Sequence, residues 1–234
     1  MSEILRIDMK TVNAYLIKTG NRFVLVDTGG YGFRDRPLSN KREILLPELE
    51  KNGCVPGTLD LVFLTHGDID HVANCRYLQE TYGAKIAVHK NDEALTHDLT
   101  VEKIFSNFKF RSIGFKIVSF LMNPLFVKIT KKIIAEYEGF TPDILFDDEF
   151  DPADYGLDAK LLPLPGHSKG SVGLLFSDGS LICGDVLANL EKPGISMNHW
   201  DLKALMKSVE SLKKETVTMV YPGHGEPFQF AELK

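Results

Sequence analysis

Short apolar runs separated by polar turns recur along the whole chain and predict strands alternating with helices. The predicted strands are 12–18, 22–28, 59–65, 85–89, 159–165, 171–177, 180–186 and 217–221. The predicted helices are 41–53, 71–82, a long helical region that ends near 138, and a last helix whose apolar face holds Leu202, Leu205, Met206, Val209 and Leu212. Strands that follow strands, with helices between them, favour an α+β fold in which helices cover the outside of sheet layers.

Length and composition are those of a globular protein with a full hydrophobic core. The chain has 234 residues, 44% of them apolar, and we expect one domain over 1–234 with a helical insertion or lid at 90–140. A net charge of −5 gives no overall attraction to nucleic acid, so no such partner is expected. Cys54, Cys75 and Cys183 form no CxxC pair, and the N-terminus lacks the apolar core of a signal peptide, which indicates a reduced, cytoplasmic setting.

A dense group of metal-ligand residue types follows the predicted strand 59–65. The stretch THGDIDH holds four of them, and three more come directly after later apolar strands or one Gly beyond. The candidates are His66, Asp68, Asp70, His71, His167, Asp185 and His224. Because strand ends on one edge of a sheet converge, we expect these seven groups to share a site. Imidazoles and carboxylates in this number suit two divalent cations with positions left for water, which indicates a catalytic centre.

Five motifs that span nearly the whole chain resemble those of the metallo-β-lactamase-fold hydrolases. They are VDTGG at 26–30, THGDIDH at 65–71, PGHSKGSVG at 165–173, CGDV at 183–186 and YPGHGEP at 221–227. The resemblance implies a four-layer αββα sandwich with a dinuclear site along one edge of its two sheets. It also implies that His66 and His167 bind the first metal and that Asp185 bridges the two metals. The remaining ligands, Asp70, His71 and His224, would contribute through the second metal.

Asp68 departs from the usual family pattern, His-x-His-x-Asp-His, because it places a carboxylate where the second histidine is expected. As an oxygen ligand it would make the first site harder and weaken the preference for zinc over manganese or ferrous iron. The alternative is that Asp68 turns outward and leaves the first site weak or empty. We expect Asp68 to coordinate, and we expect two divalent ions, zinc first, with manganese or iron as alternatives.

The expected reaction is hydrolysis of an ester, thioester or lactone in a small, partly apolar substrate by a metal-bound hydroxide, since a metal lowers the pKa of bound water towards about 7. Asp70 is placed to orient the nucleophile and to pass a proton to the leaving group. Asp27 either holds a ligand histidine by its other ring nitrogen or caps backbone amides in a turn. The alternatives are phosphodiester hydrolysis, redox chemistry at non-haem iron, and a non-catalytic metal- or lipid-binding module.

Substrate choice is expected to come from residues 101–134, which are basic and aromatic. This segment holds six Phe and seven Lys or Arg against the single acid Glu102, a formal charge of +6 in a chain of −5. We expect a lid over the metal centre, with Phe115, Phe120 and His199 as substrate contacts. The alternatives are a surface that touches lipid or a second copy of the chain in a homodimer, and a helical pair packed onto the domain with solvated lysines.

Overall fold

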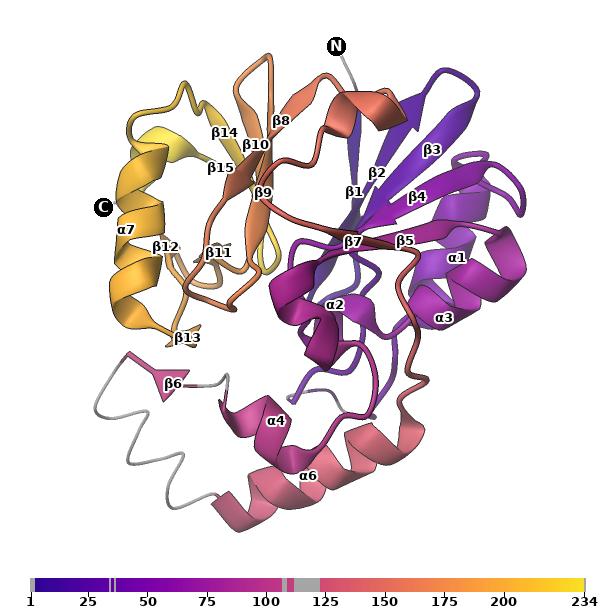
Figure 1. The fold of residues 1–234 in the computed structure, drawn as a ribbon, viewed down its shortest axis with the longest axis vertical. Helices are drawn as coiled ribbons and strands as arrows, with labels where there is room; N and C mark the ends of the chain where they lie inside the picture. The colour runs from indigo at the N-terminus through magenta and orange to yellow at the C-terminus, as the bar shows by residue number, and fades with distance from the viewer. Residues whose placement is uncertain (1–2, 34, 36, 107–108, 112–122, 234) are drawn as a thin grey trace.

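Two β-sheets face each other across the centre of the molecule, with helices on both outer sides (Figure 1). The first sheet has the strand order β1-β2-β3-β4-β5-β7 and the second the order β15-β14-β10-β9-β8. The computed structural model describes residues 3–33, 35, 37–106, 109–111 and 123–233. The predicted α+β fold, an αββα sandwich, is confirmed.

The first sheet mixes antiparallel and parallel pairs. Its strands are β1 (Ile4–Asp8), β2 (Asn13–Thr19), β3 (Arg22–Val26), β4 (Leu59–Phe63), β5 (Lys85–His89) and β7 (Ile144–Phe146). β1, β2 and β3 pair as antiparallel hairpins, whereas β3, β4, β5 and β7 are parallel neighbours. The carboxyl ends of the parallel strands therefore lie on one edge, where the segments after β3 and β4 begin.

The second sheet brings two further strand ends to a common edge. Its strands are β8 (Ala159–Pro163), β9 (Val172–Phe176), β10 (Ser180–Gly184), β14 (Met219–Pro222) and β15 (Phe228–Gln229). β10 and β14 are parallel, so the residues after Gly184 and Pro222 leave the sheet side by side. A short hairpin of β11 (Leu187–Asn189) and β12 (Pro193–Ile195) follows β10.

Buried apolar side chains fill three separate interfaces, as four layers require. Leu45 and Leu49 of helix α1 (Arg42–Lys51) are fully buried against the first sheet, beside α3 (Cys75–Tyr77) and its π-helical continuation (Leu78–Tyr82). Phe63 belongs to the cluster between the two sheets. Leu205 and Leu212 of helix α7 (Leu202–Leu212) pack on the outer face of the second sheet. Each such side chain contributes about 1.5–3 kcal/mol through burial.

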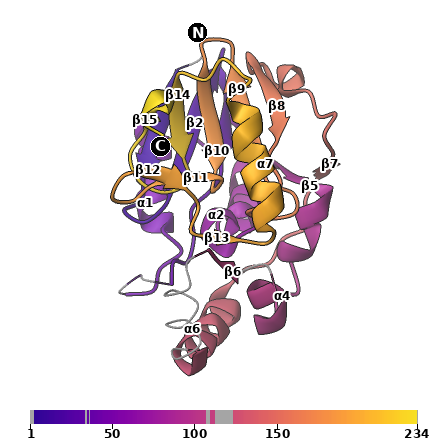
Figure 2. The ribbon, with the colours of Figure 1, turned by 90° about the vertical axis from the view of Figure 1, so that its left-hand side faces the viewer.

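The described part of the 90–140 region lies beyond the same end of the sheets as helix α2 (Ile69–Val72), as both views of the ribbon show (Figures 1 and 2). It contains a 3-10 helix (Lys90–Leu95), α4 (Val101–Ser106), β6 (Lys109–Phe110) and α6 (Asn123–Glu136). The prediction of a long helical region that ends near 138 is wrong at β6, which pairs antiparallel with β13 (Asn198–His199). A local pattern cannot reveal this strand, because its partner comes from a distant part of the chain. No described helix is long and apolar enough to cross a bilayer.

Candidate metal centre

Four strand ends deliver the predicted ligands to one edge of the sandwich. The segment after β4 carries His66 and Asp68, and α2 follows it directly with Asp70 and His71. His71 is held in place because its backbone carbonyl accepts a hydrogen bond from Thr28 N, in the turn after β3, at 2.7 Å. The edge therefore takes its shape from two parallel strands of the first sheet.

The second sheet supplies the remaining three ligands from equivalent positions. His167 follows β8, Asp185 follows β10 and His224 follows β14. Gly223 lies against Asp185 and His71, because a Cβ atom there would lie 2.1 Å from Asp185 Oδ1 and 2.7 Å from His71 Cε1. A side chain at position 223 would therefore occupy the centre of the group.

The ligand atoms form two adjoining triads that share a carboxylate. Atoms of His66, His167 and Asp185 lie within 4.8 Å of one another, and so do atoms of Asp70, His71 and His224. Asp185 also reaches the second triad, with its Oδ1 3.3 Å from His71 Nε2 and its Oδ2 3.0 Å from His224 Nε2. This position between the triads is the one that a bridging carboxylate needs.

Asp68 lies at the edge of the first triad and points inward. Its Oδ2 lies 3.0 Å from His167 Nε2 and 3.8 Å from His66 Nε2, although it belongs to neither triad. Its side chain is about one quarter exposed, at 23%. The orientation is the one that coordination would require, and coordination itself stays a prediction.

Each of the four imidazoles turns Nε2 towards the carboxylates and anchors Nδ1 on the protein. His71 Nδ1 lies 2.9 Å from Asp27 Oδ2, and His66 Nδ1 lies 2.9 Å from Thr65 Oγ1. His224 Nδ1 contacts the backbone carbonyl of Thr11, and His167 Nδ1 faces the carbonyl of Asn198 and the hydroxyl of Ser196, both at 3.4 Å. Fixing one ring nitrogen in this way selects the tautomer that leaves the other free to bind a metal.

Asp27 is the common support of both triads. Its Oδ1 accepts from Thr65 N at 2.9 Å, and its Oδ2 accepts from Thr65 Oγ1 at 2.8 Å while also facing His71. The residue adopts a left-handed conformation with φ of 59°, which Asp tolerates better than most residues. Asp27 therefore contacts the ring of a candidate ligand, as the first interpretation expects, whereas the backbone amide that it bonds belongs to a distant strand end and not to its own turn.

Burial and the neighbouring charges shift the pKa values of these candidate ligands. Burial, together with His71 and His167, lowers the pKa of His66 to about 3, so this imidazole is neutral and able to coordinate. Burial opposes the charge on His224, but Asp185 and Asp70 outweigh it and raise the pKa of His224 to about 9. Burial acts against Asp185 as well, and His224 and His71 overcome it and lower its pKa well below the usual value.

Three buried polar atoms at the centre test whether the residues present fit a metal. Among the described residues, His66 Nε2, His71 Nε2 and Asp185 Oδ1 have no hydrogen-bond partner. The 3.3 Å approach of the last two is an ion-pair contact without hydrogen-bond geometry. An unpaired buried polar atom costs about 1–3 kcal/mol, so a structure rarely places three together unless something satisfies them. Imidazoles, which become neutral when they coordinate, and carboxylates are a donor set that suits divalent transition metals.

The three predicted substrate contacts have different outcomes. Phe115 and Phe120 lie outside the described residues. His199 is buried on β13, next to Asn198, whose carbonyl faces His167. Its role in binding substrate stays a prediction.

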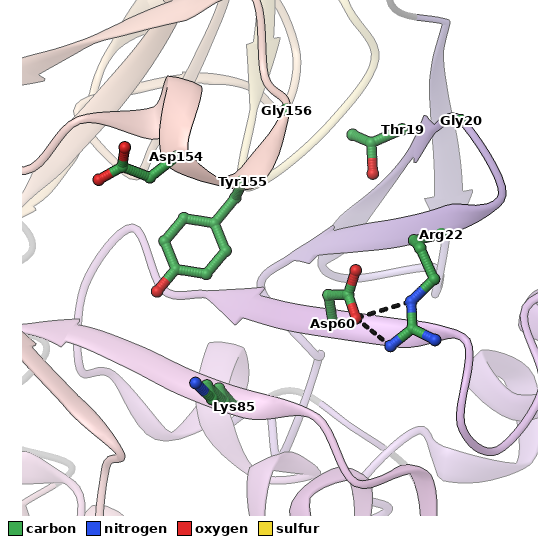
Figure 3. A pocket seen from close by; sticks show the side chains of 8 residues that line it. All are labelled: Thr19, Gly20, Arg22, Asp60, Lys85, Asp154, Tyr155 and Gly156. Carbon is green, nitrogen blue, oxygen red and sulfur yellow. Dashed lines mark hydrogen bonds and ion pairs between the residues drawn. The ribbon is translucent and has the colours of Figure 1, made fainter.

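A hollow elsewhere on the molecule carries none of the predicted ligands (Figure 3). Its volume is about 480 Å³, and Arg22, Asp60 and Lys85 line it together with Tyr155. Arg22 and Lys85 begin β3 and β5, whereas the metal ligands follow the carboxyl ends of the strands. The hollow therefore lies at the opposite edge of the first sheet from the candidate centre.

Two supporting residues were not among those predicted from the sequence. Thr65 carries the contact between Asp27 and His66, and buried Asp92 bonds Gly67, Ser168 and Gly170. Thr65 adjoins the histidine motif, which is a weak local signal. Asp92 lies in a polar stretch, KNDE, whose pattern is typical of a solvated turn.

Comparison with known proteins agrees with this geometry. The model of the metallo-beta-lactamase superfamily matches residues 8–224. A Drosophila melanogaster protein, beta-lactamase-like protein 2 homolog, is 25% identical over 219 residues, which cover 93% of this chain but only 59% of the relative's length.

Solved structures show the same fold. A metallo-beta-lactamase family protein from Thermus thermophilus, TTHA1429, superposes with a TM-score of 0.69 at 22% identity, over 97% of this chain and 74% of its own. TTHA1623 in a di-iron-bound form gives a TM-score of 0.59 at 24% identity, over 94% and 90%. From its motifs, its four layers and the match over most of its length, the chain belongs to the metallo-beta-lactamase superfamily, whose members are mostly metal-dependent hydrolases.

Proposed function

We propose that the protein is a dinuclear metal hydrolase that cleaves an ester, thioester or lactone bond in a small, partly apolar substrate. The observation that carries this proposal is the pair of triads joined by Asp185, with every imidazole presenting Nε2 and anchoring Nδ1. His66, Asp68 and His167 would hold one ion, and Asp70, His71 and His224 the other. When bound, the ions supply hydroxide at neutral pH and polarise the acyl oxygen under attack.

The chain's own catalytic group in this proposal is Asp70. Its carboxylate is partly exposed, at 26%, and its Oδ2 lies 3.4 Å from His224 Nε2. Its exposure leaves one side of the carboxylate open to a substrate, whereas Asp185 is buried. Asp70 would orient the attacking water through one oxygen and return a proton to the leaving group.

The 90–140 insertion would supply the apolar part of the substrate site. Helix α6 contributes Ile133 to a cluster with Ile69, the residue between Asp68 and Asp70. On the other flank, β6 pairs with Asn198, whose carbonyl faces His167. The insertion thus contacts the protein on both sides of the candidate centre, as a lid requires, although a helical pair packed on the domain with solvated lysines would make the same contacts.

The test is metal removal followed by reconstitution against a panel of acyl substrates. Chelated protein should lose hydrolysis of esters, thioesters and lactones, and zinc or manganese should restore it, while phosphodiesters should remain uncleaved. Cleavage that persists in the metal-free protein, or that is confined to phosphodiesters, would contradict the proposal.

A second candidate is redox chemistry at iron, and one observation favours it. Asp68 adds a carboxylate where the family usually has imidazole, and oxygen ligands suit harder ions. TTHA1623, a relative by fold, has a di-iron-bound form. Protein purified without added metal that contains iron and absorbs visible light would favour this candidate over hydrolysis.

A further inference from the structure

Asp92 is a buried carboxylate that neither triad contains. It lies in the 3-10 helix after β5, and only 1% of its surface is exposed. Within the described part of the chain it makes no ion pair, so hydrogen bonds alone satisfy its charge. Ionised carboxylates that are buried without a cation are rare, so the donors that stabilise Asp92 are the key to its role.

Its three hydrogen-bond donors come from two separate loops. Asp92 Oδ2 accepts from Gly67 N at 3.0 Å and from Ser168 Oγ at 2.5 Å, and Oδ1 accepts from Gly170 N at 2.8 Å. Gly67 lies between His66 and Asp68, and Ser168 follows His167. One carboxylate therefore joins the loops that carry three of the four groups around the first metal position.

Both loops approach the 3-10 helix that carries Asp92 too closely for a side chain. A Cβ atom at Gly170 would lie 2.8 Å from Asp92 Cγ, and one at Gly67 would lie 2.8 Å from Leu95 Cβ. Ser168 Oγ also contacts Ser171 Oγ at 2.8 Å, which fixes the direction of the hydroxyl. The contact is therefore a close-packed clamp rather than a loose surface bond.

The ligands of the second position have other supports. His71 is held by Asp27, and His224 by the carbonyl of Thr11. Among the described residues, the side chain of Asp92 accepts no hydrogen bond from either histidine or from Asp70. The clamp is consequently specific to one half of the centre.

We propose that Asp92 is a positioning residue that fixes the loops of His66, Asp68 and His167 relative to each other before a metal binds. It sets the affinity of the first metal position without touching the ion. This inference rests on the proposed metal centre, and it assigns unequal sensitivity to the two positions, which the proposed function alone does not.

The test is Asp92→Asn, followed by titration of the metal-free protein with cobalt(II), whose visible spectrum reports each bound equivalent. Asparagine keeps the shape but turns an N–H donor towards Gly67 N and Ser168 Oγ or towards Gly170 N. We expect the dissociation constant of one equivalent to rise about 10–100-fold, the range typical of residues that support a metal ligand, while the other stays unchanged. When one to two equivalents of cobalt have been added, the absorption bands of the first site should be weaker in the variant than in the wild-type protein.

Asp143→Asn is the control, at an exposed carboxylate with the same kinds of hydrogen-bond donor. Asp143 Oδ2 likewise accepts from a backbone N–H, that of Ile86 at 2.9 Å, and from a side-chain donor, Gln79 at 2.8 Å, but it contacts neither ligand loop. Ser168→Ala is a milder second variant for use if Asp92→Asn does not fold, and it should shift the same equivalent by a smaller factor.

The outcomes separate the two claims. If the dissociation constants of both cobalt equivalents are unchanged in the variant that folds, or if both rise equally, the role of Asp92 is overturned and the metal centre stands. A wild-type protein that binds no cobalt would overturn the proposed function itself.

Discussion

Asp27 offers the sharpest test of how the two triads are held together. Replacing it by Asn retains the volume and the left-handed backbone, which Asn tolerates as Asp does. The amide oxygen can still accept from Thr65, but the amide nitrogen then faces a donor, either Thr65 or the protonated His71 Nδ1. The variant therefore loses a support of His71 directly and a support of His66 through Thr65.

The expected loss follows from the number of contacts affected. Removing a residue that supports a metal ligand typically costs about 10–100-fold in affinity, equivalent to about 1.4–2.8 kcal/mol. Since Asp27 serves one histidine of each triad, we expect both metal equivalents to weaken, unlike the one-sided effect of Asp92→Asn. The buried mismatch should also lower the free energy of unfolding of the metal-free protein by about 1–3 kcal/mol.

The assay is competition with a calibrated chelator, read as two successive dissociation constants, with chemical denaturation of the metal-free protein alongside it. Asp98→Asn is the control, because Asp98 is also left-handed, with φ of 49°, but lies on the surface outside both triads. Two unchanged dissociation constants in Asp27→Asn would refute the interpretation that Asp27 positions both histidines.

Three further changes probe other parts of the account. Asp68→His should shift the relative affinity towards zinc over manganese, and an unchanged ratio would show that Asp68 does not coordinate. Raising the pH from about 6.5 through 9 should strengthen metal binding and destabilise the metal-free protein. The pKa of His224 is raised to about 9, so its protonated ring stabilises the folded protein through Asp185 below that pH and loses this contact above it. Denaturation of the metal-free protein and metal titration across this range check the fall in stability and the rise in affinity. For the lid, kcat/KM should rise by up to roughly fourfold per added acyl methylene, about 0.8 kcal/mol each, and Phe115→Ala should flatten that slope without changing metal content; a flat wild-type series would contradict the lid.

The strands and ligands that could be predicted from the sequence are those whose structure depends on neighbouring residues in the chain. Apolar runs such as 59–65 and 180–186 are buried on both faces, so they stand out from their surroundings, and the polar groups directly after them stand out equally. The strands β1, β6, β7, β11, β12, β13 and β15 were not predicted, because their pairing partners rather than their own residues stabilise them. The role of Asp92 was not predicted for the same reason, since its partners Gly67 and Ser168 are remote in the sequence.

The family resemblance supplied the division of the ligands between two metals, which spacing alone could not. Distances now show which atoms approach each other: Asp185 lies between the triads, and Asp68 faces His167. The sequence favoured an inward Asp68 but left the outward orientation open, because one rotation of the side chain separates them.

The most direct test of the account is the number of metal ions bound per chain, measured by elemental analysis after equilibration with zinc or manganese and removal of the excess. We predict two ions in the wild-type protein and one each in His167→Ala and His71→Ala, since those histidines belong to different triads. Wild-type protein that binds no divalent ion, or a histidine variant that keeps two, would contradict the dinuclear centre.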